Sequence, residues 1–224
     1  MSQDADVLIL GGGVIGLACA HYLQAEGRSV RILEQGRIGR GASYGNCGTI
    51  TPSHAAPLAA PGMAWQAMRW MLKADAPLYI RPRWDPALWR WLSRAAGRCN
   101  MDAYLASGRA KGALLRYSRA LLEDLVIGND LDCGFDSGGL YYVFRSARAM
   151  RRHARELPLL AELGIPARVL DGAALVAEEP ALKPGLAGAV FFPGDAQLRP
   201  DRYTAELARL VREDGGAIEE GVCV

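Results

Sequence analysis

Residues 7–35 read VLILGGGVIGLACAHYLQAEGRSVRILEQ, and this stretch decides the fold of the first part of the chain. The wholly apolar run Val7–Leu10 predicts a parallel strand buried on both faces. Apolar residues recur at helical spacing through Val14–Glu26, and Gly27 stands where a left-handed C-terminal cap belongs. Val30–Leu33 predicts a second strand. Together these elements form a βαβ unit, whose crossover we expect to be right-handed.

The glycines between the first strand and the helix match the dinucleotide-binding pattern GxGxxG. Gly11 permits the tight turn, Gly13 lets the backbone approach a pyrophosphate, and Gly16 lets the helix pack closely on the strand. The N-terminus of the helix then points its N–H groups at the phosphates. Glu34 stands at the end of the second strand, where a carboxylate accepts hydrogen bonds from an adenosine ribose and disfavours the 2′-phosphate of NADP. The alternative is that these glycines only form a turn and Glu34 is a surface charge.

Bulk composition excludes several classes of protein. The 224 residues are 50% hydrophobic, enough for a substantial core, and the formal net charge of +2 lacks the field expected of a nucleic-acid binder. The five cysteines have no CxxC pair, which argues against a disulfide framework or a zinc site and favours a reducing cytoplasm. We expect no metal. Neither a signal peptide nor a membrane-spanning run is apparent.

Further along the chain the sequence predicts a long loop and then a mixed region. Residues 36–62 are rich in Gly, Ser and Pro, which indicates a functional loop over a ligand. Asp85 and Pro86 predict the N-cap and first residue of a helix, and Pro158 should kink or split another. Apolar periodicity predicts helices within residues 63–96 (two helices), 104–126, 146–163 and 204–213. Strands are predicted within residues 138–145, 167–172 and 186–198 and from residue 217.

The order of these elements favours FAD over NAD, although both share the glycine motif. In a plain nicotinamide enzyme the second strand usually continues into another helix and a third strand. Here a long loop and a large mixed insertion intervene, and a further helix and strand of the cofactor domain return only near residue 204. The segments expected are 1–75 for the first part of an FAD-binding domain, 76–195 for an inserted substrate and helical domain, and 196–224 for an incomplete second FAD-binding part.

The chain resembles the N-terminal part of the FAD-dependent D-amino acid dehydrogenases, within the wider family that includes D-amino acid oxidase, glycine oxidase and sarcosine oxidase. Besides the glycine turn, the resemblance rests on the stretches GASYGNCGTITPSHAAPLAAPG, YSRALLEDL, GGLYYVFR, EEPAL and FPGDAQLRPDRYTAELA. The first contains the Ser-x-x-Asn-x-Gly loop of that family and an Ala-Ala-Pro run. His54 and Thr49 depart from the residues common at their positions. The resemblance implies an α/β fold: a Rossmann-like FAD-binding domain with an inserted α+β substrate domain, the C-terminal half being absent.

The resemblance also implies a set of cofactor-binding residues. Gly11, Gly13 and Gly16 would bind the pyrophosphate and Glu34 the ribose, as the motif itself predicts. Others would contact the phosphates, the ribityl chain, the flavin ring or adenine: Ser43, Asn46, Gly48, Thr49 and Val224. For Ser43 and Asn46 the alternative is a plain turn residue. His54 and Tyr142 are the nearest candidates for the substrate pocket, against the alternative that each is a packing or surface residue.

For activity the resemblance implies oxidative deamination of D-amino acids to 2-oxo acids and ammonia, by hydride transfer to flavin, with electrons passed to a quinone-type acceptor. The arginine that binds the substrate carboxylate is implied to lie in the absent half, so no catalytic residue is assigned. Two alternatives stay open: an oxygen-using oxidase of glycine, sarcosine or D-hydroxyproline, and a truncated chain without enzymatic activity.

All five tryptophans fall in one stretch that is also rich in basic residues. They are Trp65, Trp70, Trp84, Trp89 and Trp91, interleaved with Arg69, Lys73, Arg81, Arg83, Arg90, Arg94 and Arg98. Aromatic and basic residues on amphipathic helices favour an anionic bilayer surface, which suits a peripheral enzyme on the inner face of the cell membrane. The alternative is that the tryptophans pack on the core and the arginines form a solvated face.

Overall fold

The computed structural model describes residues 5–71, 75, 79–81 and 83–223 and divides the chain into two compact units. Unit 1 consists of Met1–Ile50, Leu121–Gly139 and Asp195–Val224, and unit 2 of Thr51–Ala120 and Leu140–Gly194. These structural units are defined by contacts within the chain; the domain borders predicted after residues 75 and 195 stay predictions. The assignment of cofactor and substrate domains to these segments stays a prediction.

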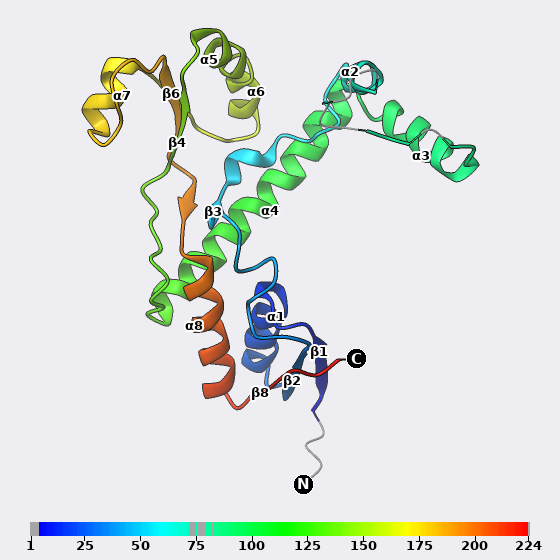
Figure 1. Ribbon diagram of the computed structural model, residues 1–224, viewed down its shortest axis with the longest axis vertical. Helices are drawn as coiled ribbons and strands as arrows, with labels where there is room; N and C mark the ends of the chain where they lie inside the picture. Colours follow the sequence, from blue (N-terminus) through cyan, green and yellow to red (C-terminus); the bar gives the residue numbers. More distant parts are fainter. Residues whose placement is uncertain (1–4, 72–74, 76–78, 82, 224) are drawn as a thin grey trace. The chain divides into compact units, whose positions relative to one another are not determined.

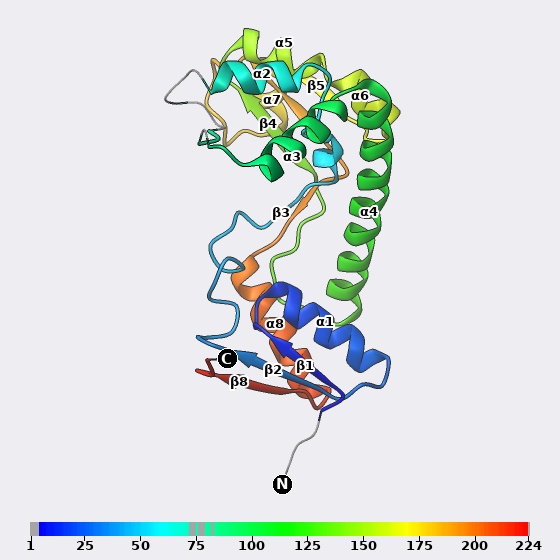
Figure 2. The same ribbon diagram turned by 90° about the vertical axis from the view of Figure 1, so that its right-hand side faces the viewer.

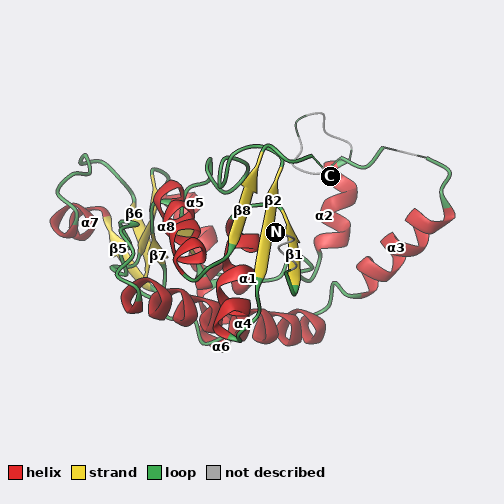
Figure 3. Ribbon diagram, turned by 90° about the horizontal axis from the view of Figure 1, so that it is seen from below, coloured by secondary structure: helices red, strands yellow, loops and turns green. Residues whose placement is uncertain are grey.

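Unit 1 is built on a parallel three-stranded sheet in the order β1-β2-β8 (Figure 3). Its strands are β1 (Val7–Leu10), β2 (Val30–Glu34) and β8 (Ala217–Glu220). Helices α1 (Val14–Ala25) and α8 (Pro200–Glu213) pack against each other and lie on one side of this sheet (Figure 2). The core is formed by side chains of both helices, of β2 and of residues 125–133; the fully buried ones are Leu17, Ala20, Ile32, Cys133, Leu207 and Val211.

The first strand is buried on one face only, which corrects the expectation that both faces of Val7–Leu10 are buried. Val7 and Ile9 pack on the core, but Leu8 is 56% exposed and Leu10 61% exposed. The physical reason is that successive side chains of a strand point to opposite faces. The helices of unit 1 cover one face, and an apolar run does not by itself reveal whether the other is covered.

The ends of the helices in unit 1 follow the turn chemistry of the sequence. Gly27 has φ +76° and ends α1 in the left-handed region, as predicted. Gly215 has φ +83° just after α8. Helix α8 begins at Pro200, four residues before the predicted start at Thr204, because a proline suits the first turn of a helix.

The long loop after β2 contains a short strand and a helical turn. Strand β3 (Thr49–Ile50) pairs antiparallel with β7 (Ala196–Gln197) in unit 1. The 3₁₀ turn η1 (Pro52–Ala55) belongs to unit 2. Neither element was predicted within residues 36–62, since both are too short to show periodicity.

Unit 2 has an antiparallel sheet in the order β4-β6-β5, with helices α5 and α7 against it (Figure 1). Its strands are β4 (Leu140–Phe144), β5 (Arg168–Asp171) and β6 (Gly188–Phe192). Its helices are α2 (Met63–Trp70), α3 (Pro86–Gly97), α5 (Ala147–Ala154), α6 (Leu157–Glu162) and α7 (Gly172–Glu178). Helix α4 (Met101–Gly128) has residues in both units.

In unit 2 the sequence correctly predicted the cap of α3 and the break at Pro158, but it did not predict α7. The Asp85 carboxylate accepts hydrogen bonds from the N–H groups of Ala87 and Leu88, so it caps α3 as predicted. The helix expected over residues 146–163 is split into α5 and α6, with Pro158 in the first turn of α6. Helix α7 was not predicted, although Asp171 caps it in the same way.

In the part of the chain that the structure describes, no helix combines the length and apolarity that crossing a bilayer requires.

Candidate nucleotide-binding site

The glycine turn of unit 1 leaves open space beside Gly11. Gly11 adopts φ +103°, which favours glycine, and a Cβ at this position would meet no heavy atom within 4 Å. Its N–H donates to the carbonyl of Leu33 at 2.8 Å, which ties the turn to β2. A Cβ on Gly16 would instead collide with the carbonyl oxygen of Gly11 and lie 3.2 Å from Cγ2 of Ile9. These contacts agree with the roles that the motif predicts for Gly11 and Gly16.

Glu34 organises the turn through two backbone hydrogen bonds. Its Oε1 accepts the N–H of Gly36 and its Oε2 accepts the N–H of Gly12, each at 2.8 Å. These bonds, the one from Gly36 first, lower the pKa of the Glu34 carboxyl below its ordinary value of 4.5. Each carboxylate oxygen keeps a further lone pair, so the ionised side chain can still accept a ribose hydroxyl.

Ser43 joins the long loop to the start of α1. Its Oγ accepts a hydrogen bond from the N–H of Val14 at 3.0 Å, so a hydroxyl distant in sequence takes the place of a helix cap. A second link is the hydrogen bond from the Gly39 N–H to the carbonyl of Gly12 at 2.9 Å. The structure therefore brings the glycine turn and the loop together.

The remaining loop residues act mainly on the loop itself. The Asn46 amide donates to the carbonyls of Ala42 and Ser43, and its oxygen accepts the N–H of Gly48 at 2.8 Å. Gly48 has φ +66°, and a Cβ there would collide with the carbonyl of Leu198. Thr49 is exposed and pairs with Gln197 across β3 and β7. Contact of Asn46, Gly48 and Thr49 with a ribityl chain or flavin stays a prediction.

The sequence did not predict a role for Gly12 or Ile38. A Cβ on Gly12 would overlap Cδ1 of Ile38, so the Ile38 side chain lies directly over Gly12. The only sequence signal was that Gly12 lies inside an uninterrupted run of three glycines, one more than GxGxxG needs.

Val224, a predicted adenine contact, lies outside the described residues, and so does Lys73.

His54 and Tyr142 meet in unit 2. Nε2 of His54 lies 2.8 Å from the Tyr142 hydroxyl, and Nδ1 lies 3.3 Å from the Thr51 hydroxyl. The Tyr142 ring stacks on His153 of α5, with centroids 6.0 Å apart, and meets Phe192 edge-on at 5.2 Å. The approach of His153 to Tyr142 depends on how α5 packs on the sheet, so the sequence pattern does not reveal it. The pairing keeps His54 and Tyr142 as candidates but does not assign them a substrate.

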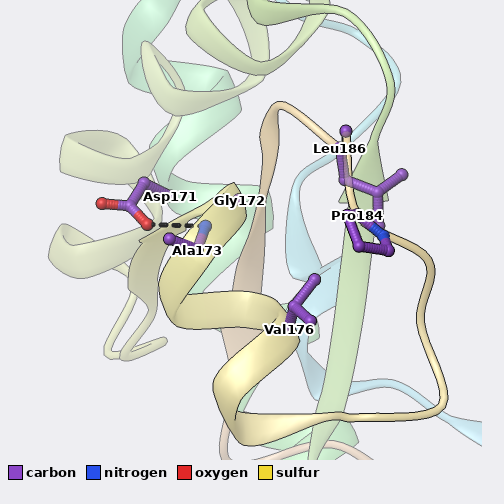
Figure 4. A pocket seen from close by; sticks show the side chains of 7 residues that line it. Asp171, Gly172, Ala173, Val176, Pro184 and Leu186 are labelled. Carbon is purple, nitrogen blue, oxygen red and sulfur yellow. Dashed lines mark hydrogen bonds between the residues drawn. The ribbon is translucent and has the colours of Figure 1, made fainter.

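A hollow at the start of α7 offers less chemistry (Figure 4). The Asp171 carboxylate beside it already accepts hydrogen bonds from the N–H groups of Ala173 and Ala174. The other lining residues carry no ionisable group: Gly172, Ala173, Val176, Pro184, Gly185 and Leu186. We therefore do not treat this hollow as a candidate site.

Comparison with known proteins identifies the family. The family model described as FAD dependent oxidoreductase matches residues 6–224, and the chain belongs to this family, whose cofactor is FAD. Among curated proteins, the chain is 36% identical over 214 residues to a D-amino acid dehydrogenase of Granulibacter bethesdensis, covering 93% of this chain and 51% of that protein. It is 35% identical over 225 residues to the D-amino acid dehydrogenase of Methylobacterium radiotolerans, covering 97% and 53%.

Solved structures agree on the fold. Glycine oxidase from Geobacillus kaustophilus matches with a TM-score of 0.68 at 23% identity, covering 97% of this chain and 46% of that one. L-amino acid deaminase from Proteus myxofaciens matches with a TM-score of 0.63 at 18% identity, covering 99% and 39%. The α/β flavoenzyme fold and the family expected from the sequence are confirmed. The chain spans about half the length of the curated relatives it matches.

The residues of unit 1 fit such a cofactor. Gly11 leaves open space beside the turn, α1 begins at Val14, and the Glu34 carboxylate accepts the N–H of Gly12, so the turn offers both an open position for a phosphate and an acceptor for a ribose hydroxyl.

Proposed function

We propose that the protein is an FAD-dependent dehydrogenase that oxidises D-amino acids to 2-oxo acids and ammonia and passes the electrons to a quinone-type acceptor. The substrate class is taken from the names of the curated relatives, which are D-amino acid dehydrogenases. The single observation that carries the proposal is the hydrogen bond between Ser43 Oγ and the Val14 N–H. It holds the long loop against the start of α1, where the pyrophosphate is proposed to bind.

The residues that would hold FAD lie along the turn and the loop. Gly11, Gly13 and Gly16 would admit the pyrophosphate, and Glu34 would accept the ribose hydroxyls. The Ser43 hydroxyl, which accepts from Val14, can rotate its own proton toward a phosphate oxygen. The loop residues proposed beside the ribityl chain and the ring are Asn46, Gly48 and Thr49. When bound, FAD supplies the acceptor for the hydride that leaves the substrate Cα.

His54 and Tyr142 are proposed to present polar groups to the substrate. Both ring nitrogens of His54 face hydroxyl groups, Thr51 at Nδ1 and Tyr142 at Nε2. A hydroxyl can donate or accept, so the proton of a neutral imidazole can be held at either nitrogen without leaving the other without a partner. The pair can therefore adapt to a donor or an acceptor on the substrate.

Visible absorbance of the purified natural protein tests the cofactor, and turnover tests the reaction. We expect a flavin band and oxidation of D-alanine, but not L-alanine, with a dye acceptor at a much higher rate than with oxygen. Faster turnover with oxygen would favour the alternative, an oxidase of glycine, sarcosine or D-hydroxyproline. A protein without a flavin band would contradict the proposal.

A membrane-facing surface is the second part of the proposal. On α2, Trp65 and Arg69 border one hollow. Trp91 and Arg94 of α3, with Arg98 just after the helix, border another. The tryptophans at 65, 84, 89 and 91 are exposed rather than packed in the core of unit 2. Exposed indole rings beside guanidinium groups suit the headgroup region of an anionic bilayer, which is where a quinone acceptor would be reached.

Vesicle binding tests this surface. We expect the protein to float with phosphatidylglycerol vesicles, less with phosphatidylcholine vesicles, and less at high salt. Trp89→Ser and Trp91→Ser should each weaken the binding. Tyr117→Ser should not, because Tyr117, although an equally exposed aromatic, lies on α4 and borders neither hollow. Equal loss with Tyr117→Ser, or no preference for anionic lipid, would contradict the assignment.

A further inference from the structure

The turn that follows Glu34 is held from its far side by the next parallel strand. In the register of β2 and β8, Glu34 lies opposite Glu220, so two carboxylates stand at the same end of the sheet. Oε1 of Glu220 accepts the N–H of Ile38 at 2.6 Å. Two backbone hydrogen bonds accompany it: the N–H of Gly221 donates to Gly36 at 3.2 Å, and the N–H of Val222 donates to Glu34 at 3.0 Å.

These bonds connect β8 to the glycine turn in two steps. Glu220 holds Ile38, and the Ile38 side chain covers Gly12 so closely that a Cβ there would overlap it. The next residue, Gly39, donates its N–H to the carbonyl of Gly12. Gly12 in turn donates its N–H to Glu34, the proposed ribose ligand.

We infer that Glu220 is a positioning residue of the nucleotide site: by accepting the Ile38 N–H it holds residues 36–39 over Gly12 and so sets the place of Glu34. This inference rests on the proposed function, since it deepens the assignment of the same site. Glu220 is exposed and makes no contribution to the core, so its carboxylate serves the turn rather than the packing of the sheet.

Glu219 provides a matched control. It is the preceding residue of the same strand, carries the same charge, and forms an ion pair with Arg31 at 3.1 Å instead of contacting residues 36–39. Replacing Glu219 or Glu220 by alanine therefore removes the same side chain, but only Glu220→Ala releases Ile38. Glu220→Gln keeps an oxygen that can accept the Ile38 N–H, so it should keep residues 36–39 in place and retain FAD affinity.

The experiment measures FAD and ADP affinity of the natural protein after removal of its flavin. We expect Glu220→Ala to raise both dissociation constants about tenfold, the effect of one hydrogen bond to a charged acceptor. Glu219→Ala and Glu220→Gln should stay within about threefold of the wild type. Amide hydrogen exchange over residues 36–39 of the FAD-free protein should accelerate in Glu220→Ala and not in Glu219→Ala.

The outcomes separate the inference from the proposed function. If the wild type binds no FAD, both are wrong. If the wild type binds FAD and Glu220→Ala binds it equally well, or leaves exchange at residues 36–39 unchanged, this inference alone is overturned. Should Glu220→Ala fail to fold, the Glu220→Gln variant takes its place. FAD affinity and hydrogen exchange close to those of the wild type support the inference, and an FAD affinity lower by more than about tenfold overturns it.

Discussion

At the scale of a single residue, Gly16 shows which contact makes the motif glycine necessary. In the GxGxxG motif this glycine allows the helix to approach the strand closely. In this chain the neighbour that forbids a side chain is the carbonyl oxygen of Gly11, a backbone atom that cannot rotate away. The turn and the helix therefore tolerate no side chain at Gly16.

Gly16→Ala should destabilise unit 1 and weaken FAD binding. A methyl group forced against backbone typically costs about 1–3 kcal/mol, and relief requires that Gly11 move. Thermal unfolding and flavin fluorescence would measure the two effects. Gly41→Ala is the control, because a Cβ at Gly41 meets nothing within 4 Å. Equal stability of the two variants would contradict the close approach of strand and helix.

Glu34 makes the stability of unit 1 dependent on pH with a definite sign. Hydrogen bonds from the N–H groups of Gly36 and Gly12 favour the charged form and lower the pKa in the folded protein. A group whose pKa is lowered by folding contributes stability above its unfolded pKa, near 4.5, and loses this contribution as pH falls through the folded value.

Glu34→Gln should therefore unfold at a lower temperature than the wild type near neutral pH, and the difference should shrink below about pH 4.5. The comparison isolates Glu34, since all other carboxyl groups titrate in both proteins. Melting temperatures measured from neutral to acidic pH supply the test. A difference that stays constant with pH would show that the Glu34 charge is not involved.

At the scale of elements, helix α3 depends on its cap more than a core helix would. None of its residues is fully buried, so tertiary packing contributes little, and the Asp85 carboxylate with Pro86 defines where the helix begins. Arg83 lies 3.0 Å from the same carboxylate. The position of the tryptophans on α3 thus depends on one exposed side chain.

Asp85→Ala should fray α3, because the first N–H groups of the helix lose their N-cap acceptor. Asp85→Asn should retain most of the stability, because an amide oxygen also accepts the N–H groups of Ala87 and Leu88. Hydrogen exchange over residues 86–97 would report the change. Protection that is the same in Asp85→Ala and the wild type would contradict the role of the cap.

At the scale of the whole molecule, the sheet of unit 1 presents apolar surface on the face opposite its helices. Leu8 and Leu10 lie on that face of β1, which is also an edge strand in the order β1-β2-β8. An exposed apolar edge promotes association with other chains.

We expect residues 1–224 expressed alone to associate and to bind a hydrophobic dye. Replacing Leu8 and Leu10 by threonine should reduce both, because threonine keeps a side chain suited to a strand while removing apolar area. Ile15→Gln is the control, since Ile15 is also exposed but lies on α1. Light scattering and dye fluorescence decide, and a monomeric chain that binds no dye would contradict the expectation.

The sequence by itself determined the βαβ unit, the place of the first turn, the cap of α3, the break at Pro158 and the family. These features follow from periodicity, from glycine and proline geometry, and from short-range capping, all of which act within a few residues. Signals of this kind survive in a linear chain because their partners are close along it.

Only the tertiary structure decided which faces are covered and which distant residues meet. The exposure of Leu8 depends on packing. Three contacts join residues 29 to 182 positions apart: the hydrogen bond from Val14 to Ser43, the pairing of His54 with Tyr142, and the hydrogen bond from Ile38 to Glu220. Such contacts depend on strand register and helix packing. The local sequence around one partner therefore does not predict which distant residue it meets.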